Sequence, residues 1–299
     1  MLWPNINEDI PSILINYYSD IVEINNLYKK SNSIQRIIRK ISSDLGASTG
    51  IFLESWKKDM NKYDMIIIHA NRINRTVPKH LRKLGYKGRI IYWFWNPVSN
   101  CVNPQKVDRK YCELWSFDKK DCESYNLKYN STYYFSRIAA KCNGDNRSVF
   151  FIGRDKGRYG FIKELEDRLN KLGFVTDFNI IKDETSAAGN QYNKPLPYFE
   201  VVNRIKKSFC ILDVVQKGQV GLSLRPMESV FFEKKQLTTN KEIKNEPFYN
   251  KNDFYIIGGI EDNDDKLKSF LSGAYVKQSE KILKYYDFEN WIQRFNERL

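Results

Sequence analysis

The stretch "SVFFIGRDKGRYGFIKELEDRLNKLGF" (residues 148–174) decides the fold class. It starts with a short apolar run, SVFFIG (148–153), which is typical of a buried strand that ends in glycine. An amphipathic helical pattern with Gly173 at its end follows over 159–174. A buried strand that leads directly into a helix is the repeating unit of α/β proteins with parallel sheets. We therefore expect a parallel sheet in this half of the chain.

The same alternation of strands and helices extends in both directions. Towards the C-terminus we expect strands at 175–181, 209–215, 236–240 and 253–259, and helices at 198–208 and from about Pro226. Towards the N-terminus we expect strands at 12–16, 65–70, 89–95, 114–118 and 131–135, and helices at 33–46, 77–88 and 119–129. The whole chain is therefore predicted to be α/β.

The length of 299 residues favours two domains over one core. Residues 138–148, IAAKCNGDNRS, lack periodicity and contain Asn, Gly and Asp, which predicts a linker. We expect one Rossmann-like domain over 1–140 and a second over 148–275, facing each other across a cleft. The segment 279–299 is predicted to be a long amphipathic helix that could cross back onto the first domain.

Composition indicates a cytosolic protein without a metal centre. No apolar run approaches the ~20 residues of a membrane helix, and the N-terminus lacks the pattern of a signal peptide. The two histidines form no H-x-x-x-H motif, and the cysteines form no CxxC pair. We expect reduced thiols at all five cysteines, which are Cys101, Cys112, Cys122, Cys142 and Cys210.

The net charge of +13 is concentrated in the first half. Residues 1–150 hold 24 Lys and Arg against 14 Asp and Glu, whereas residues 151–299 hold 25 against 22. Such an excess suggests an anionic partner, namely a lipid surface, a phosphorylated substrate or nucleic acid. A lysine-rich solvated face with no partner explains it equally well.

A candidate anion site follows the strand 148–153. Gly153 is succeeded by three cations within five residues, Arg154, Lys156 and Arg158, at the carboxyl end of the strand. A helix that starts here would present unpaired backbone N–H groups, and with the cations these would suit a diphosphate. The loop has neither a Walker pattern nor G-x-G-x-x-G, so a basic surface turn is the alternative.

A second candidate lies in "LSLRPMESVFFEKKQLTTN" (222–240). Pro226 is favourable in a first helical turn, and Arg225 and Glu228 lie one turn apart. The Glu228 carboxylate could accept hydrogen bonds from the vicinal hydroxyls of a ribose, and Arg225 could contact a phosphate or sugar. The alternatives are that Glu228 only caps the helix, or that Arg225 and Glu228 form an ion pair.

These two segments together resemble the nucleotide-binding domain of GT-B glycosyltransferases of bacterial surface-polysaccharide (capsule or lipopolysaccharide) biosynthesis. The resemblance covers about residues 148–258 and rests on the GR…KG segment (153–157) and the segment around Glu228. It implies that Arg154 and Lys156 hold the donor diphosphate and that Glu228 holds the donor ribose. It also implies a nucleotide sugar as substrate, with no metal or other cofactor.

The sequence departs from the family motif at three positions. Val220 stands where retaining members have a second glutamate, and Glu233 replaces a glycine. Ser229 stands where the motif has alanine, directly after the ribose glutamate. The first of these leaves retaining or inverting stereochemistry open.

The first domain would supply a general base to the acceptor hydroxyl. His69 ends the strand 65–70 with an ordinary pKa near 6.5, and Asp118 ends the strand 114–118 as its competitor. Trp93 or Trp95 could line an acceptor site, although core packing is favoured for both.

The resemblance implies transfer of a sugar from a nucleoside-diphosphate donor to a polysaccharide or lipid-linked acceptor. The basic first domain would then contact the anionic inner face of the membrane, and no nucleic acid is expected to bind. Two alternatives remain, a nucleotide-sugar 2-epimerase of the same fold and a non-catalytic, degenerate protein that binds nucleotide sugars or membranes.

Overall fold

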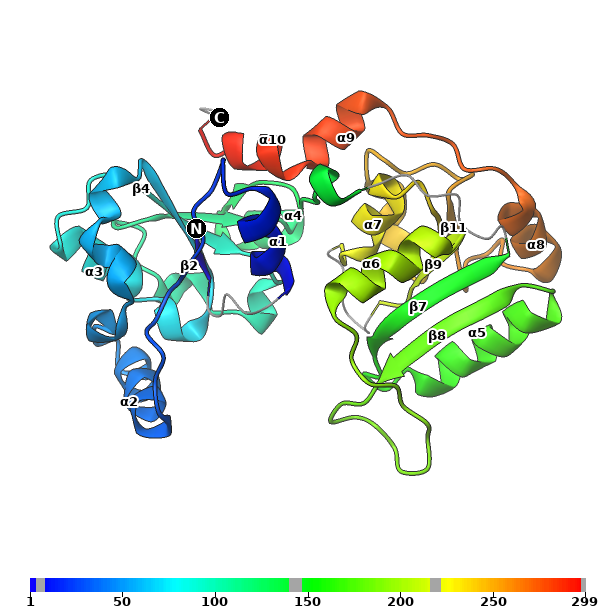
Figure 1. Cartoon of the computed structure of the whole chain (residues 1–299), viewed down its shortest axis with the longest axis horizontal. Helices are drawn as coiled ribbons and strands as arrows, with labels where there is room; N and C mark the ends of the chain where they lie inside the picture. Colours follow the sequence, from blue (N-terminus) through cyan, green and yellow to red (C-terminus); the bar gives the residue numbers. More distant parts are fainter. Residues whose placement is uncertain (4–8, 140–146, 216–221, 297–299) are drawn as a thin grey trace. The chain divides into compact units, whose positions relative to one another are not determined.

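The computed structural model describes residues 1–3, 9–139, 147–215 and 222–296. The chain forms two compact units (Figure 1): unit 1 is Met1–Thr132 with Arg294–Leu299, and unit 2 is Tyr133–Gln293. The division falls between Thr132 and Tyr133, whereas the expected linker at 138–148 lies mostly outside the described residues. Each unit is built on a wholly parallel sheet, which confirms the predicted α/β class with two parallel-sheet domains.

Unit 1 has a six-stranded sheet in the order β2-β1-β3-β4-β5-β6. The strands are β1 (Leu2–Trp3), β2 (Asn25–Asn26), β3 (Met65–His69), β4 (Arg89–Phe94), β5 (Glu113–Ser116) and β6 (Lys128–Tyr129). The α-helices of this unit are α1 (Asp9–Tyr17), α2 (Ser33–Asp44), α3 (Val77–Lys83) and α4 (Lys119–Tyr125). Strand order reverses between β1 and β3, where Leu2 pairs with Ile68, so this is the topological switch point of the sheet.

Unit 2 has a five-stranded sheet in the order β11-β10-β9-β7-β8, with its switch point between β7 and β9. The strands are β7 (Ser148–Arg154), β8 (Val175–Ile181), β9 (Cys210–Asp213), β10 (Lys235–Thr238) and β11 (Phe254–Ile256). The helices are α5 (Tyr159–Lys171), α6 (Tyr198–Lys207), α7 (Arg225–Phe231), α8 (Asp264–Ser272), α9 (Glu280–Tyr286) and α10 (Phe288–Gln293).

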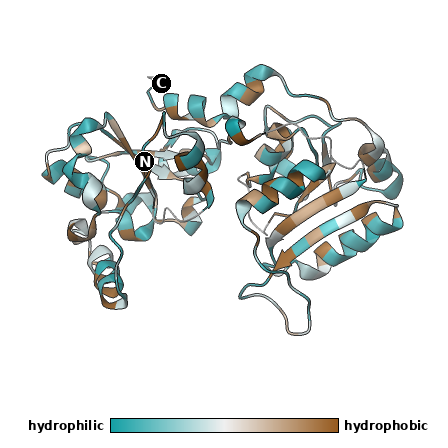
Figure 2. Ribbon diagram, viewed as in Figure 1, coloured by the Kyte–Doolittle hydropathy of each residue, from teal (hydrophilic) through white to brown (hydrophobic). Residues whose placement is uncertain are grey.

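The helices of unit 2 cover both faces of its sheet. Buried leucines of α5 and α8, such as Leu165 and Leu267, share one core cluster with Val149 and Phe151 of β7. The helices α6 and α7 lie together on the opposite face (Figure 1). Right-handed crossovers require this arrangement, because the chain moves in opposite directions before and after β8. Figure 2 shows the apolar residues concentrated along β7 and the polar ones along the outer side of α5.

Three predicted elements are wrong. The segment 12–16 lies in helix α1, whose first turn carries Asp9 and Pro11, both favourable at that end. The segment 131–135 forms no strand and only one isolated bridge, between Tyr134 and Asp287. The described part of the predicted helix at 279–299, which ends at residue 296, contains two helices, and the backbone of Tyr134 bonds to Tyr286 O and Phe288 N at the break between them.

The four described cysteines, Cys101, Cys112, Cys122 and Cys210, are free thiols, as predicted, and Cys142 lies outside the described residues. Over the described ranges, no helix is both long and apolar enough to cross a membrane.

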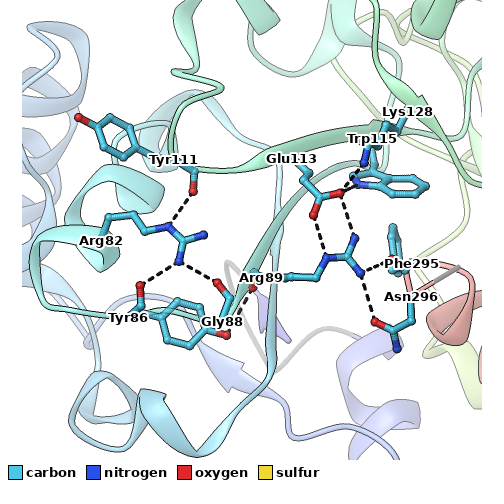
Figure 3. A network of polar contacts seen from close by, with 10 residues as sticks. All are labelled: Arg82, Tyr86, Gly88, Arg89, Tyr111, Glu113, Trp115, Lys128, Phe295 and Asn296. Atoms are coloured by element: carbon cyan, nitrogen blue, oxygen red, sulfur yellow. Dashed lines mark hydrogen bonds and ion pairs between the residues drawn. The ribbon is translucent and has the colours of Figure 1, made fainter. Parts of the chain in front are cut away.

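Residues 294–296 pack in unit 1. The ring of Phe295 contacts Trp93 and Trp115 edge-to-face, with centroids 6.0 and 5.0 Å apart. Figure 3 shows Arg89 donating to Phe295 O and to Asn296 Oδ1 while it forms a bidentate ion pair with Glu113 (2.8 and 2.9 Å). Burial opposes ionisation of Glu113, but hydrogen bonds from Arg89 and Lys128 outweigh it and lower the Glu113 pKa to about 2.

Candidate functional site

The switch point of unit 2 brings together polar side chains from two loops and one helix start. Strands β7 and β9 lie next to each other, with Val149 paired to Cys210 and Phe150 to Ile211. Their carboxyl ends therefore share one edge of the sheet, which is where open parallel sheets bind ligands. The loop after β7, the loop after β8 and the start of α7 all contribute residues there.

The backbone amides of the β7–α5 loop are already hydrogen-bonded. Lys156 N donates to Asp183 Oδ2 (2.8 Å) and Gly157 N donates to Thr185 Oγ1 (2.7 Å). The buried carboxylate of Asp155 accepts from Arg158 N (3.0 Å) and from the next amide (2.9 Å). The sequence predicted unpaired N–H groups at this helix start. The structure corrects that prediction, because side-chain oxygens of its own chain take these donors.

Arg158 has a structural role in this loop. Its guanidinium donates to Arg154 O (2.6 Å), Asp155 O (3.1 Å) and Val214 O, and so ties the end of β7 to the end of β9. These bonds use donors that the sequence prediction assigned to a diphosphate.

Arg154 and Lys156 are the cations that remain available. Both side chains are exposed, and neither makes a side-chain hydrogen bond or ion pair within the described residues. Lys156 is held in the left-handed region with φ of 49°, which a lysine adopts rarely. Hydrogen bonds from Thr185 and from Lys156 N, together with the nearby charge of Arg154, lower the pKa of Asp183. The pair of cations therefore lies at this edge with the carboxylates of Asp183 and Glu184 nearby.

Arg225 and Glu228 form an ion pair inside unit 2. The Glu228 side chain is 0% exposed, and its other oxygen accepts from Tyr198 OH (2.9 Å), which is in turn hydrogen-bonded to Tyr134 OH (2.7 Å). Arg225 Nη2 donates to Ile152 O (3.2 Å), which links α7 to β7. The ion-pair alternative is therefore correct. Both carboxylate oxygens of Glu228 already have partners within the protein, so a ribose would have to compete with Arg225 and Tyr198 for them.

The other motif positions have different outcomes. Glu233, where the family has glycine, has φ of 55°, the left-handed conformation that glycine adopts most easily. Ser229 is buried, and its hydroxyl donates to Lys234 O (2.5 Å). Gly153 lies within β7 next to the ring of Phe151, 3.0 Å from where a Cβ would stand. Val220 lies outside the described residues.

Sequence reasoning missed Asp213. This buried carboxylate ends β9 and accepts from Ser223 Oγ (2.9 Å) and Thr238 Oγ1 (3.3 Å). Burial raises its pKa, while the hydroxyl of Ser223 and the charges of Arg225 and Arg158 oppose that rise. An aspartate at the carboxyl end of an otherwise apolar strand, CILD, was the available signal. Its hydrogen bonds to Ser223 and Thr238 link the end of β9 to the segment before α7 and to β10.

His69 lies at the switch point of unit 1 in an apolar environment. Its ring packs against Trp3 (centroids 3.7 Å apart) and Trp95 (5.9 Å), and it is 1% exposed. Nδ1 is 3.2 Å from Leu2 O, while Nε2 has no hydrogen-bond partner. Burial lowers the His69 pKa to about 3. The prediction of an ordinary pKa for this residue is wrong, and a neutral, weakly basic imidazole occupies the site.

Asp118 acts as a helix cap. Its Oδ1 accepts from Asp121 N (3.0 Å) at the start of α4, and the side chain is largely buried. His69 ends β3 and Asp118 follows β5, so both residues lie at the carboxyl edge of the sheet of unit 1, with β4 between the two strands.

The two tryptophans of this edge differ. Trp93 is buried against Phe295, as the core prediction has it, whereas Trp95 is 40% exposed and donates to Ala70 O (3.3 Å). Trp95 is therefore the aromatic side chain that a ligand could reach. Among the residues described in either unit, no three His, Cys, Asp or Glu side chains are placed to hold a metal ion.

Together these features define a chain of two doubly wound α/β units, with a cation pair at the switch point of unit 2. No known protein family matches the sequence, and no curated protein matches it either. Among solved structures, the chain is similar to a spinosyn forosaminyltransferase, SpnP (10% identity, TM-score 0.39, 96% of this chain and 88% of that one). It is also similar to a protein from Listeria monocytogenes described as a UDP-N-acetylglucosamine 2-epimerase (11% identity, TM-score 0.45, 95% of this chain and 84% of that one).

Proposed function

We propose that the protein is a GT-B-type glycosyltransferase that binds a nucleoside-diphosphate sugar at the carboxyl edge of the sheet of unit 2. The observation that carries the proposal is the pair of exposed, unengaged cations, Arg154 and Lys156, at a topological switch point. Two cations separated by a single residue suit a diphosphate, because each can neutralise one phosphate group.

The diphosphate would be held by side chains and not by backbone amides. Asp183 and Thr185 occupy the amides of Lys156 and Gly157, so the phosphates would meet the Arg154 guanidinium and the Lys156 ammonium directly. Arg158 and Arg225 are engaged with carbonyls and with Glu228, and would contribute their charge across a longer distance. Gly153 would not contact the ligand through a side-chain position, because its Cβ position faces the ring of Phe151.

In the proposed reaction the acceptor hydroxyl oxygen attacks the anomeric carbon and the bond from that carbon to the phosphate oxygen breaks. The nucleoside diphosphate leaves with the bonding electrons, and the hydroxyl proton passes to a base or to solvent. Arg154 and Lys156 would stabilise the negative charge that develops on the leaving group. The acceptor would be a saccharide or a lipid-linked saccharide, delivered in the cell-envelope pathway that the sequence resemblance implies.

Binding is tested by calorimetry with UDP, GDP, ADP, CMP and their sugar conjugates. The double variant Arg154→Ala/Lys156→Ala should weaken binding of the best ligand by roughly 100-fold or more, because it removes two charge-assisted hydrogen bonds worth about 1.5–3 kcal/mol each. Lys171→Ala is the matched control, since it removes an exposed cation from the other end of α5. If no nucleotide binds, or if the double variant binds like the control, the donor site is not here.

A second variant separates the two roles of Glu228. Because Glu228 is buried in an ion pair, Glu228→Gln should lower the melting temperature in either case. If Glu228 is only structural, the affinity of the folded variant for the donor changes little, and if it also holds the ribose, the affinity falls. Incubation of the preferred nucleotide sugar without any acceptor distinguishes the reaction class, because an epimerase converts the sugar under these conditions and a transferase does not.

A further inference from the structure

We propose that helix α2 of unit 1 is a docking element for an anionic lipid surface. The helix has five large aliphatic side chains on one side, and all five are exposed to solvent. They are Ile34 (69%), Ile37 (58%), Ile38 (47%), Ile41 (53%) and Leu45, the C-cap (79%). Spacings of three and four residues place them in one stripe along the helix. An exposed stripe of this size is the reverse of what a packed surface helix normally shows.

The side of α2 that contacts the protein is the polar one. Ser43 is the buried residue of the helix, and its hydroxyl donates to Arg72 O (2.8 Å). Arg39 stacks over the ring of Tyr28 (4.3 Å), and Arg75 donates to Ser43 O. At 100° per residue, Arg39 and Ser43 lie on the side of the helix opposite Ile34 and Ile41. Because the polar side is anchored, the aliphatic stripe faces solvent. Figure 1 shows α2 at the periphery of unit 1.

The helix is formed before any partner arrives. Asn32 and Gln35 make a reciprocal capping box at its start, with Gln35 N donating to Asn32 Oδ1 (2.9 Å) and Asn32 N to Gln35 Oε1 (3.2 Å). Arg72 forms an ion pair with Asp44 at the other end (2.8 Å). A surface that is already ordered loses little conformational entropy on docking.

The charges around the aliphatic stripe favour an anionic bilayer as its binding partner. Exposed cations lie just before and along the helix, namely Lys29, Lys30, Arg36 and Lys40, and no Asp or Glu occurs between Ile24 and Ser43. A basic amphipathic helix of this kind lies in the plane of an anionic bilayer, with its apolar side among the acyl chains. A second copy of the same helix would bring like charges together. At 12 residues, or about 18 Å, the helix is too short to span a bilayer and must lie along its surface.

The inference is tested by sedimentation of the full-length protein with vesicles of phosphatidylcholine, alone or mixed with phosphatidylglycerol, without any nucleotide. We expect binding to the mixed vesicles to be about tenfold tighter or more, and to weaken with salt. Ile37→Asp/Ile41→Asp should abolish it, and Arg36→Gln/Lys40→Gln should weaken it about tenfold. Ile260→Asp, at an exposed isoleucine of unit 2, is the control and should bind like the unmodified protein.

Three results would overturn the inference. These are no binding to the mixed vesicles, binding that survives the Ile37/Ile41 change, and a concentration-dependent dimer in sedimentation velocity that this change abolishes. The last result would assign the stripe to a second copy of the chain. Since the substituted side chains are exposed, unchanged melting temperatures are expected and serve as the folding check. Nucleotide binding is measured separately, so either proposal can fail without the other.

Discussion

The carboxylate of Glu228 lies inside unit 2, where Arg225 and Tyr198 hold its two oxygens. A charge at this depth is tolerable only when it is paired, and removing one member of a buried pair typically costs about 3–5 kcal/mol. The spacing of Arg225 and Glu228 made the ion pair one of the alternatives. The sequence could not decide whether Glu228 forms this ion pair or binds a ribose, because Tyr198 and Tyr134 are remote in the chain and complete the network only after folding.

The buried imidazole of His69 should make unit 1 sensitive to acid. Its folded-state pKa of about 3 lies below the ordinary value of 6.5, so the unfolded chain takes up the proton first as the pH falls. The effect of His69 on the free energy of unfolding should therefore be constant above pH 6.5. Below pH 6.5, this residue should lower the free energy of unfolding by about 1.4 kcal/mol per pH unit, down to about pH 3.

Urea unfolding of the protein and of His69→Phe across this range measures the effect. The variant should lose less stability on acidification, whatever its stability at pH 8. Parallel pH profiles for the two proteins would show that His69 titrates normally.

At the level of elements, α7 ends in a residue that strains the backbone. Glu233 follows Phe232, the C-cap, in the left-handed conformation at φ of 55°. This conformation costs a residue with a Cβ roughly 1 kcal/mol relative to glycine. The strain explains why glycine suits this position in the motif that the sequence resembles.

Glu233→Gly should accordingly be more stable than Glu233→Ala by about 1 kcal/mol. Both variants remove the same carboxylate, so the comparison isolates the backbone conformation from any contact of the side chain. Chemical denaturation of the two variants gives the difference. Equal stabilities would mean that the turn relaxes to another conformation.

The longer elements of both sheets could be predicted from the sequence, because a run of buried residues such as IIYWF is long enough to show a pattern. The two-residue strands β1, β2 and β6 could not, since two residues carry no periodicity. The segment 12–16 was wrongly predicted as a strand, because a five-residue apolar run such as SILIN fits a buried strand and a buried helix equally well. At the candidate site, the sequence showed which residues are cations. It could not show that Asp183 and Thr185 take the amides of Lys156 and Gly157, because these bonds join two different loops.

At the scale of the whole molecule, unit 1 is made from two separate stretches of chain. Phe295 reaches the tryptophans of β4 and β5, and Arg294 donates to Asn130 Oδ1 (2.9 Å) and Ser131 Oγ (2.6 Å). Phe288, seven residues earlier, packs instead against Tyr133 and Trp291 of unit 2. Both phenylalanines are fully buried, and they offer a matched pair of probes.

Phe295→Ala should destabilise unit 1, and Phe288→Ala should destabilise unit 2, each by about 3–5 kcal/mol. Hydrogen exchange followed by mass spectrometry shows which unit each variant destabilises. Peptides from β4 and β5 should exchange faster in the first variant, and peptides around Tyr133 and Trp291 in the second. Faster exchange of the same peptides in both variants would contradict the assignment of the two residues to different units.

Unit 2 is, in chain order, an insertion into unit 1. During synthesis the sheet of unit 1 leaves the ribosome with the face around Trp93 and Trp115 uncovered, and Phe295 follows only after the 161 residues of Tyr133–Gln293. At about 5–20 residues per second this delay is roughly 8–30 s. The N-terminal half must therefore persist with an open aromatic face until unit 2 has been made, and in that interval it is a natural client for a chaperone.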